Sequence, residues 1–227
     1  MAANYMEGFD FSRLEHYQRG GAVLPNGDQY MGEIDVHDDL VEVFPDKRDT
    51  ISYHAGGYNF KSGMNRPGEN VVVILESPHR FEYDRSNNPV GLAMGKTGDN
   101  FFSYFPEALG KGRFHMASGK YNLIFTNAVQ YQTSCGLNPI DRDLRDANWI
   151  DVYENHGGKD DFKWRLYALN PKYLFNLCTG GKNPQGLRQK VTDTLEEMEF
   201  VKSRDFAEGR HPSSWEYGGN SNNAIIY

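Results

Sequence analysis

The sequence has only two cysteines, Cys135 and Cys178, in 227 residues. Two thiols so far apart form neither a disulfide framework nor the closely spaced ligand pairs of a zinc site. No apolar run approaches the roughly 20 residues that span a bilayer, and residues 1–7 show no basic segment before an apolar core. These absences argue against disulfide-rich secreted classes and membrane-spanning classes, and we expect a protein of the reducing cytoplasm.

Positive charge is also scarce. The chain has 24 Lys and Arg against 31 Asp and Glu, which gives a formal net charge of −7. This balance argues against broad, non-specific binding of nucleic acid. It leaves room for a locally basic groove, because the field at a cleft depends on where the charges lie.

The main aliphatic run is Val71–Leu75, which is rich in β-branched residues. Such a run is typical of a strand buried on both faces of a parallel sheet. It ends at Glu76, Ser77, Pro78 and His79, so a carboxylate, a hydroxyl and an imidazole follow the strand directly. In open α/β sheets, ligands bind at the carboxyl ends of the strands. An ordinary strand end with a proline turn fits the same residues, so this stretch alone does not define a site.

Further apolar segments alternate with helical patterns. Leu123–Phe125 and Tyr173–Cys178 are expected to be buried strands, and a short fourth strand is expected to begin at Phe200. Apolar residues at helical spacing predict helices over these segments: 101–109, 140–152, 159–169 and 186–198. The alternation predicts an α/β fold, a single domain with a central, mainly parallel four-stranded sheet flanked by helices.

The amino-terminal part lacks the buried strand patterns of the rest. We expect residues 1–68 to form an extension packed on the main domain, which covers residues 69–227. A short helix is expected before residue 20, and a hairpin between residues 22 and 43, where Pro25–Asp28 is a turn signal. The segment 44–69 is rich in Gly, Pro, Asn and Asp, and we expect connecting loops there.

Five short motifs follow one another in the main domain. Residues 75–79, 91–94, 125–128, 177–180 and 211–215 read Leu-Glu-Ser-Pro-His, Gly-Leu-Ala-Met, Phe-Thr-Asn-Ala, Leu-Cys-Thr-Gly and His-Pro-Ser-Ser-Trp. In order and context they resemble the uracil-DNA glycosylase superfamily. Members of that superfamily have Gly-Gln-Asp-Pro-Tyr-His or Gly-Glu-x-Pro-Gly, then Gly-Leu-Ala-Phe, a strand ending in Asn, a strand ending in Gly, and His-Pro-Ser-Pro-Leu. The resemblance covers about residues 69–216 and implies the three-layer fold of that superfamily.

The resemblance also implies a reaction, the hydrolysis of the N-glycosidic bond of a base flipped out of DNA. Such an enzyme needs a carboxylate near the sugar and donors aimed at the departing base. By resemblance, Glu76 is the catalytic carboxylate, as in the Glu-x-Pro branches, because Ser77 stands where other branches have a water-activating Asp. His211 corresponds to the His that donates to the base carbonyl, and Asn127 to the Asn that reads the pairing edge of the base.

The other substrate contacts implied by the resemblance come from Ser77, Pro78, His79, Met94 and Ser213. Met94 replaces the Phe that stacks on the base, and its thioether offers less surface to a ring; a plain core Met fits this position as well. His79 replaces the Tyr that excludes bulky pyrimidine substituents, which indicates a different or larger base.

The expected partner is DNA, contacted by Arg210, Ser214 and Trp215. Trp215 falls where the family has a Leu that wedges into the duplex, although a Trp packed in a loop fits the position equally. The cleft face is expected to be locally positive, with these residues as candidates: Arg80, Lys96, Lys182 and Arg210. We expect a monomer without membrane contact. No metal or cofactor is expected, since the iron–sulfur branches use four cysteines and this chain has two.

Three functions remain open at this point. The first is a monofunctional DNA glycosylase for a modified, bulky pyrimidine such as those of bacteriophage DNA, with a role in defence by analogy. The second is a conventional glycosylase that removes uracil in repair. The third is a catalytically inactive module of the same fold that binds a base or nucleic acid without cleavage. Glu76 favours the enzymes, because an inactive descendant has no need of a carboxylate at that strand end.

Overall fold

The computed structural model describes residues 25–226, with gaps at residues 39, 55–56, 87, 113, 134–140, 181–185, 203–204 and 216–225. The helix expected before residue 20 lies outside the described residues, as do Cys135 and Lys182.

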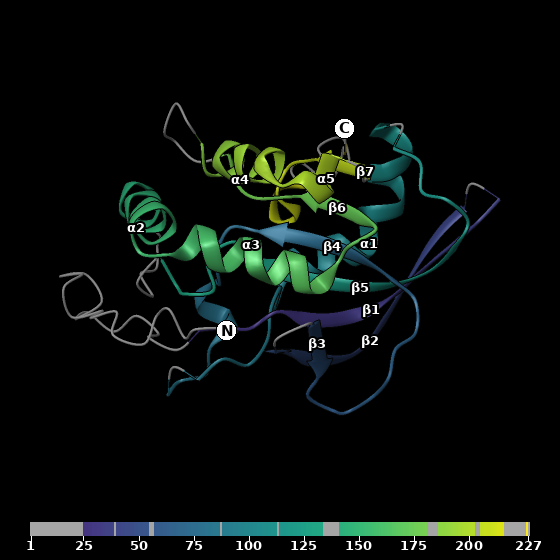
Figure 1. Cartoon of the computed structure of the whole chain (residues 1–227), viewed down its shortest axis with the longest axis horizontal. Coiled ribbons are helices and arrows are strands. Elements are labelled where there is room, and N and C mark those ends of the chain that lie inside the picture. Colours follow the sequence, from purple (N-terminus) through teal and green to yellow (C-terminus); the bar gives the residue numbers. More distant parts are fainter. Residues whose placement is uncertain are drawn as a thin grey trace.

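The described part of the chain forms one mixed sheet of seven strands, in the order β3-β2-β1-β5-β4-β6-β7 (Figure 1). Their bounds are β1 Gln29–His37, β2 Leu40–His54, β3 Gly57–Phe60, β4 Glu69–Leu75, β5 Gly119–Asn127, β6 Tyr173–Asn176 and β7 Asp205–Glu208. β5, β4, β6 and β7 are parallel to one another, whereas β1 pairs antiparallel with β2 and β5, and β3 pairs antiparallel with β2.

Helices cover both faces of the parallel strands. They are α1 Lys96–Gly112, α2 Arg142–Asn155, α3 Gly158–Leu169, α4 Leu187–Glu197 and the short α5 Glu199–Lys202, with single 3₁₀ turns η3 Arg80–Glu82 and η4 Pro212–Ser214. Figure 1 shows α3 crossing in front of the sheet. No helix in the described ranges has both the length and the apolar content needed to cross a membrane.

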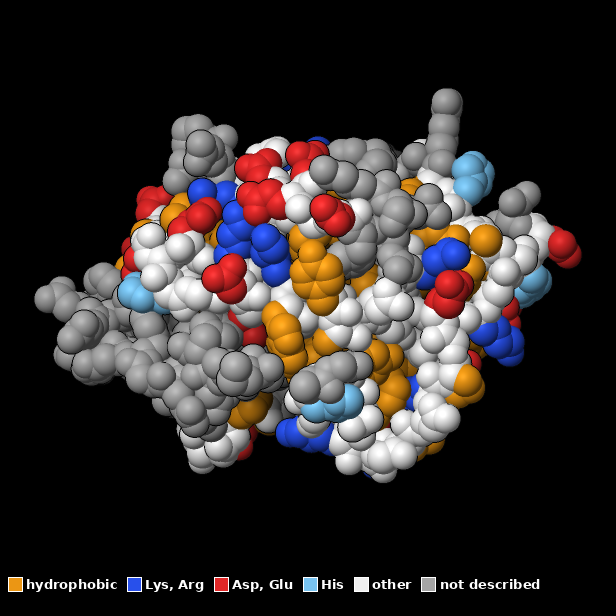
Figure 2. All heavy atoms as spheres, viewed as in Figure 1, with side chains coloured by type: hydrophobic (Ala, Val, Ile, Leu, Met, Phe, Trp, Pro, Cys, Tyr) orange, Lys and Arg blue, Asp and Glu red, His pale blue; other side chains and the backbone are white. Residues whose placement is uncertain are grey.

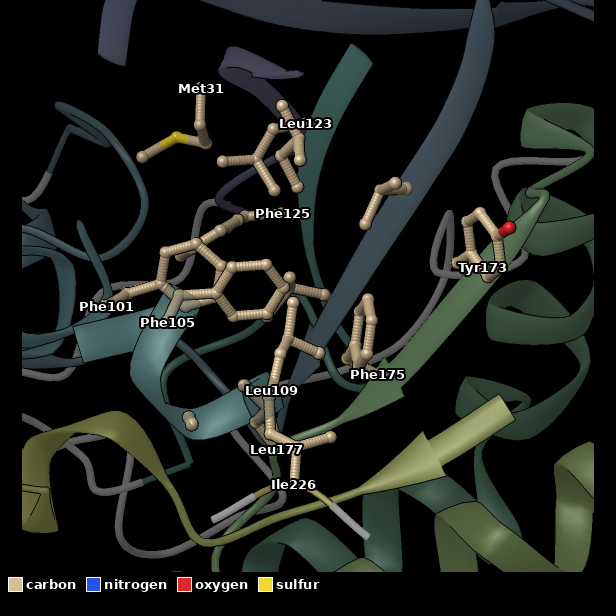
Figure 3. Packing of buried hydrophobic residues seen from close by; sticks show 14 of the residues in the cluster. Met31, Phe101, Phe105, Leu109, Leu123, Phe125, Tyr173, Phe175, Leu177 and Ile226 are labelled. Atoms are coloured by element: carbon tan, nitrogen blue, oxygen red, sulfur yellow. The ribbon is translucent and has the colours of Figure 1, made fainter. Parts of the chain in front are cut away.

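The alternation of side chains along β4 explains these layers. Val71, Val73 and Leu75 pack in one cluster with Phe101 and Phe105 of α1 (Figure 3). The intervening residues of the same strand pack with apolar side chains of α2, α3 and α4 in a second cluster. A strand buried on both faces needs apolar residues at every position, which is the pattern of the sequence.

The predicted α/β class and the parallel central strands are confirmed, but the four-stranded sheet is wrong because the sheet has seven strands. Residues 29–60 form β1–β3 and extend the same sheet, where a hairpin and connecting loops were expected. The expected hairpin exists as β1 and β2, but its turn lies next to Asp38, while Pro25–Asp28 precedes β1 and forms no turn. β2 has many polar residues because much of it is exposed, and a strand with a solvated face does not read as an apolar run.

The expected fourth strand is also displaced. Residues 199–202 form α5, and the strand, β7, begins at Asp205. β7 nevertheless completes the parallel set by pairing with β6.

A buried ion pair ties three segments together behind the end of β5. The Arg165 guanidinium of α3 donates from Nη1 to both carboxylate oxygens of Asp28, at 2.8 and 2.9 Å. Its Nη2 donates to the backbone oxygen of Asn127 at 2.9 Å, and its Nε to Asp161 at 2.6 Å. This pair fixes the backbone at the carboxyl end of β5.

Candidate functional site

The carboxyl ends of the parallel strands bring polar side chains to one edge of the sheet. Glu76 follows β4, Asn127 ends β5, Thr179 follows β6 and His211 follows β7. Leu75 pairs in register with Asn127, so Glu76, the next residue, lies just beyond the end of β5. The Nε2 atom of His211 lies 3.4 Å from the Oε2 atom of Glu76.

The Glu76 carboxylate is held on both oxygens. The residue is only 8% exposed. Its Oε2 accepts a hydrogen bond of 3.4 Å from the backbone N–H of Thr179, and its Oε1 lies 3.9 Å from Nη1 of Arg145 on α2. Its backbone oxygen accepts a bond of 2.7 Å from the indole of Trp149. The side chain is therefore fixed in one orientation inside the site.

The His211 ring has a defined tautomer. Its Nδ1 accepts a bond of 3.2 Å from the backbone N–H of Ser213. A neutral imidazole that accepts at Nδ1 carries its proton on Nε2, the atom that faces Glu76. Burial lowers the pKa of His211, and the charge of Glu76 only partly opposes this. The neutral ring thus presents an N–H donor to the site.

The Asn127 side chain is the unusual feature of this edge. The residue is 1% exposed, and neither Oδ1 nor Nδ2 has a hydrogen-bond partner among the described residues. The Oγ1 atom of Thr179 is buried without a partner in the same way. An unpaired buried polar group costs about 1–3 kcal/mol. Such groups at the same sheet edge as a carboxylate and an imidazole are what a site for a polar ligand needs.

The remaining predicted contacts take different positions. The Ser77 hydroxyl lies 2.9 Å from that of Thr133, and Pro78 is buried. His79 is exposed and caps η3, because its Nδ1 accepts from Phe81 N–H at 3.3 Å. Partial burial lowers the pKa of the His79 ring, and the charge of Glu76 partly opposes this.

Met94 and the two serines near His211 have partners of their own. The Met94 thioether contacts the guanidinium of Arg48 on β2. The Ser213 hydroxyl lies 2.8 Å from Nδ1 of His211, and that of Ser214 donates to the His211 backbone oxygen at 2.8 Å. Both serines therefore position His211.

The prediction that Trp215 wedges into DNA is wrong for this structure. The indole is 0% exposed, stacks near Phe101 with 6.0 Å between ring centroids, and donates from Nε1 to the Arg210 backbone oxygen at 2.7 Å. A side chain packed in the core of the domain cannot enter a duplex. The other reading of this residue, a Trp packed in its loop, is confirmed.

A buried carboxyl organises the loops next to the site. Glu82 accepts from the backbone N–H groups of Ala93, at 2.7 Å, and His79, at 3.2 Å. It thus joins the segment after β4 to the segment before α1. Burial raises the pKa of Glu82 to about 8.

The raised pKa of Glu82 predicts a pH-dependent stability. Above pH 4.5, the ordinary pKa of a Glu side chain, the unfolded state releases a proton that the folded state keeps. The free energy of unfolding should therefore fall as pH rises from 4.5 towards 8, by up to about 1.4 kcal/mol per pH unit for one proton. Urea unfolding across this range should show a flatter profile for Glu82→Gln than for Glu196→Gln, which alters an exposed carboxyl on α4. Equal pH slopes in the two variants would refute this.

Three of the cations predicted for the cleft face, Arg80, Lys96 and Arg210, are exposed. Arg145, which was not predicted, lies next to Glu76. The face over α3 and α4 carries both signs of charge, since Figure 2 shows acidic and basic side chains side by side there. Ion pairs on this face include Lys159 and Lys163 with Glu197, and Lys190 with Glu154.

Two members of the site were missed from the sequence. Thr179 falls within a motif quoted above, so its place after a strand was a usable signal. Arg145 reaches Glu76 from α2, and no local pattern marks it. Among the described residues, no group of three or more His, Cys, Asp or Glu side chains could hold a metal ion.

A cavity of about 740 Å³ lies at the other end of β4, lined by residues that include Tyr58, Asn70, Trp164 and Tyr167. None of its described lining residues has a buried side-chain polar atom without a partner. We therefore place the candidate site at Glu76.

No family model, curated protein or solved structure matches this chain. The geometry of the site, together with its motifs, is thus the basis for assigning a function.

Proposed function

We propose that the protein is a monofunctional DNA glycosylase that hydrolyses the N-glycosidic bond of a flipped base, with a modified pyrimidine as the substrate class. One observation carries the proposal: the buried, unpartnered amide of Asn127 lies at the same sheet edge as the Glu76–His211 pair. A base has donors and acceptors side by side on its pairing edge, and one amide can bind both.

The three side chains have complementary roles in this reaction. Asn127 would bind the pairing edge of the base. The Nε2–H of His211 would donate to a base carbonyl as negative charge develops there. Glu76 would stabilise the positive sugar and orient the water that attacks it. The water oxygen bonds to the sugar carbon and its proton passes to Glu76, while the electron pair of the broken bond leaves with the base.

The preference for a bulky pyrimidine rests on His79. This residue stands where the resemblance places an excluding Tyr, and its ring is turned into the cap of η3. Held there, the ring is an imidazole in a place where the resembling family has a phenol. A substituent on the base would then meet less obstruction.

A binding module without catalysis is the second candidate, and one observation favours it. Both oxygens of Glu76 have partners, with His211 and Thr179 on Oε2 and Arg145 near Oε1. A carboxylate so occupied has fewer free directions for a water molecule. Base binding would then persist without hydrolysis.

Defined oligonucleotides separate these candidates. Strands with one uracil or one 5-substituted pyrimidine, single-stranded and paired, are incubated with the protein and then treated with alkali, which breaks the chain at abasic sites. The glycosylase proposal expects breaks at the substituted base, more than at uracil. Breaks at uracil alone would favour a repair enzyme. Binding without breaks at any base would favour the module.

The lack of partners for the Asn127 amide leads to a prediction for a variant of this residue. Asn127→Leu removes a buried polar group that has no partner, so the free energy of unfolding should stay constant or rise. Base release should fall by about 5- to 150-fold, the equivalent of one bidentate base contact of about 1–3 kcal/mol. Chemical unfolding and single-turnover base release measure the two effects.

Asn176 provides the matched control, since it is also a buried Asn at the end of a parallel strand. Its Nδ2 donates to the Arg188 backbone oxygen and to Thr192 Oγ1, both at 3.0 Å. Asn176→Leu should therefore lower stability by about 1–3 kcal/mol. If Asn127→Leu costs as much stability as Asn176→Leu, the Asn127 amide is structural.

A further inference from the structure

Phe81 is exposed in the loop that follows Glu76. It is 64% exposed, the largest value for a large apolar side chain among the described residues. It lies in η3, directly after the Glu76–His79 segment, and its ring centroid is 5.1 Å from that of His79. Val90, 49% exposed, belongs to the same loop, where its N–H donates to the Glu82 backbone oxygen at 2.9 Å.

The loop that carries Phe81 is internally braced. Its turn is closed by the reciprocal hydrogen bonds between His79 and the Phe81–Glu82 segment. Further along, Tyr83 pairs with Pro89, and the Asp84 carboxylate accepts from the backbone N–H groups of Ser86 and Asn88 at 2.8 and 2.9 Å. A ring held outward by such a loop loses little freedom when it binds.

We infer that Phe81 enters the base stack of duplex DNA at the place that the flipped nucleotide leaves. This inference rests on the proposed function, because it assumes a base bound at Glu76 and Asn127. Proteins that distort DNA insert apolar side chains between bases. Trp215, which the motif order would assign to this task, is enclosed in the core. Phe81 has the exposure that Trp215 lacks, and it follows Glu76 closely in the chain.

Charge around the loop favours DNA over an apolar partner. Arg80 and Arg85 belong to the same loop as Phe81 and are exposed, whereas the carboxylate of Asp84 between them is occupied by the backbone N–H groups of Ser86 and Asn88. Exposed guanidinium groups in the loop of an exposed aromatic ring suit a duplex, whose bases stack on the ring while its phosphates bind the cations. A purely apolar partner would offer no anionic group to these guanidinium groups.

Two measurements test the inference. The first is single-turnover base release from the same modified strand, free and paired. Phe81→Ala should slow release from the duplex about ten- to hundredfold and change release from the single strand less than about twofold, since stacking replaces a lost neighbour only in the duplex. Phe81→Trp should restore most of the duplex rate. The control is Phe44→Ala, which removes an exposed Phe from β2.

The second measurement is independent of catalysis. Affinities are compared for an intact duplex and for one with a single abasic site, whose gap a ring can fill. The wild type and Phe44→Ala should prefer the abasic duplex, and Phe81→Ala should lose the preference. The inference is overturned if Phe81→Ala keeps that preference, or slows release equally from single and double strands. If the wild type releases the base and Phe81→Ala behaves like the wild type in both measurements, the inference alone is refuted. If the wild type prefers the abasic duplex but releases no base, the proposed reaction alone is refuted.

Discussion

Glu76→Gln is expected to slow base release by about 10²–10⁴-fold, the usual cost of losing one positioned acid–base group. Gln keeps the shape of the side chain and removes its charge. Under the glycosylase proposal DNA affinity should hold or rise, because the loss of a negative charge does not weaken the attraction of the phosphates. Single-turnover rates and equilibrium binding on one modified duplex measure the two effects separately.

Ser77→Ala is the control for this variant. Ser77 stands where the resembling family has its Asp, but its hydroxyl contacts Thr133 and carries no charge. Its loss should cost far less than the loss of the Glu76 charge. A dead Ser77→Ala beside a fully active Glu76→Gln would mean that the carboxylate has been misassigned. His211→Ala should fall between them, with a loss on the order of 10²–10³ for one donor to the leaving base.

Arg165→Leu is expected to lower the free energy of unfolding by about 3–5 kcal/mol, because it leaves the Asp28 carboxylate buried without its cation. Asp28 is 0% exposed and Arg165 is 1% exposed. The double variant Asp28→Leu, Arg165→Leu should recover much of the loss, since two apolar side chains leave no buried charge. Urea unfolding at pH 7 measures each variant.

Lys163→Met provides the surface comparison. Lys163 lies on the same helix, 3.5 Å from Glu197, in a pair that is partly exposed on both sides. Its loss should cost less than about 1 kcal/mol. If Arg165→Leu costs no more than Lys163→Met, the buried pair does not hold the end of β5 as described.

The parallel half of the sheet could be predicted because its signals are local. Val71–Leu75 is apolar at every position, and each polar residue that follows a strand of this kind must lie at the carboxyl edge. That rule was enough to place Glu76 and Asn127 at one sheet edge. His211, which contacts Glu76, was placed by the motif resemblance. The antiparallel half gave no such signal. Most side chains of β2 are exposed or only partly buried, so its sequence is polar and resembles that of a loop.

Tertiary packing decided what the sequence could not show. Trp215 occupies the expected position of its motif, yet its indole is buried, where it stacks near Phe101 and donates to the Arg210 backbone oxygen. Arg145 reaches Glu76 from a helix whose sequence marks no site. The lack of partners around the Asn127 amide is likewise visible only in the fold, although it is the observation that supports the function most.

The central claim is that Glu76 drives the release of a modified base from DNA. DNA from varied phages is incubated with the wild type and with Glu76→Gln, and the free bases are identified by mass spectrometry. The glycosylase proposal expects a free substituted pyrimidine with the wild type and a loss of at least about 10²-fold in its amount with Glu76→Gln at early times. No free base from any DNA, or equal release by both proteins, would contradict it.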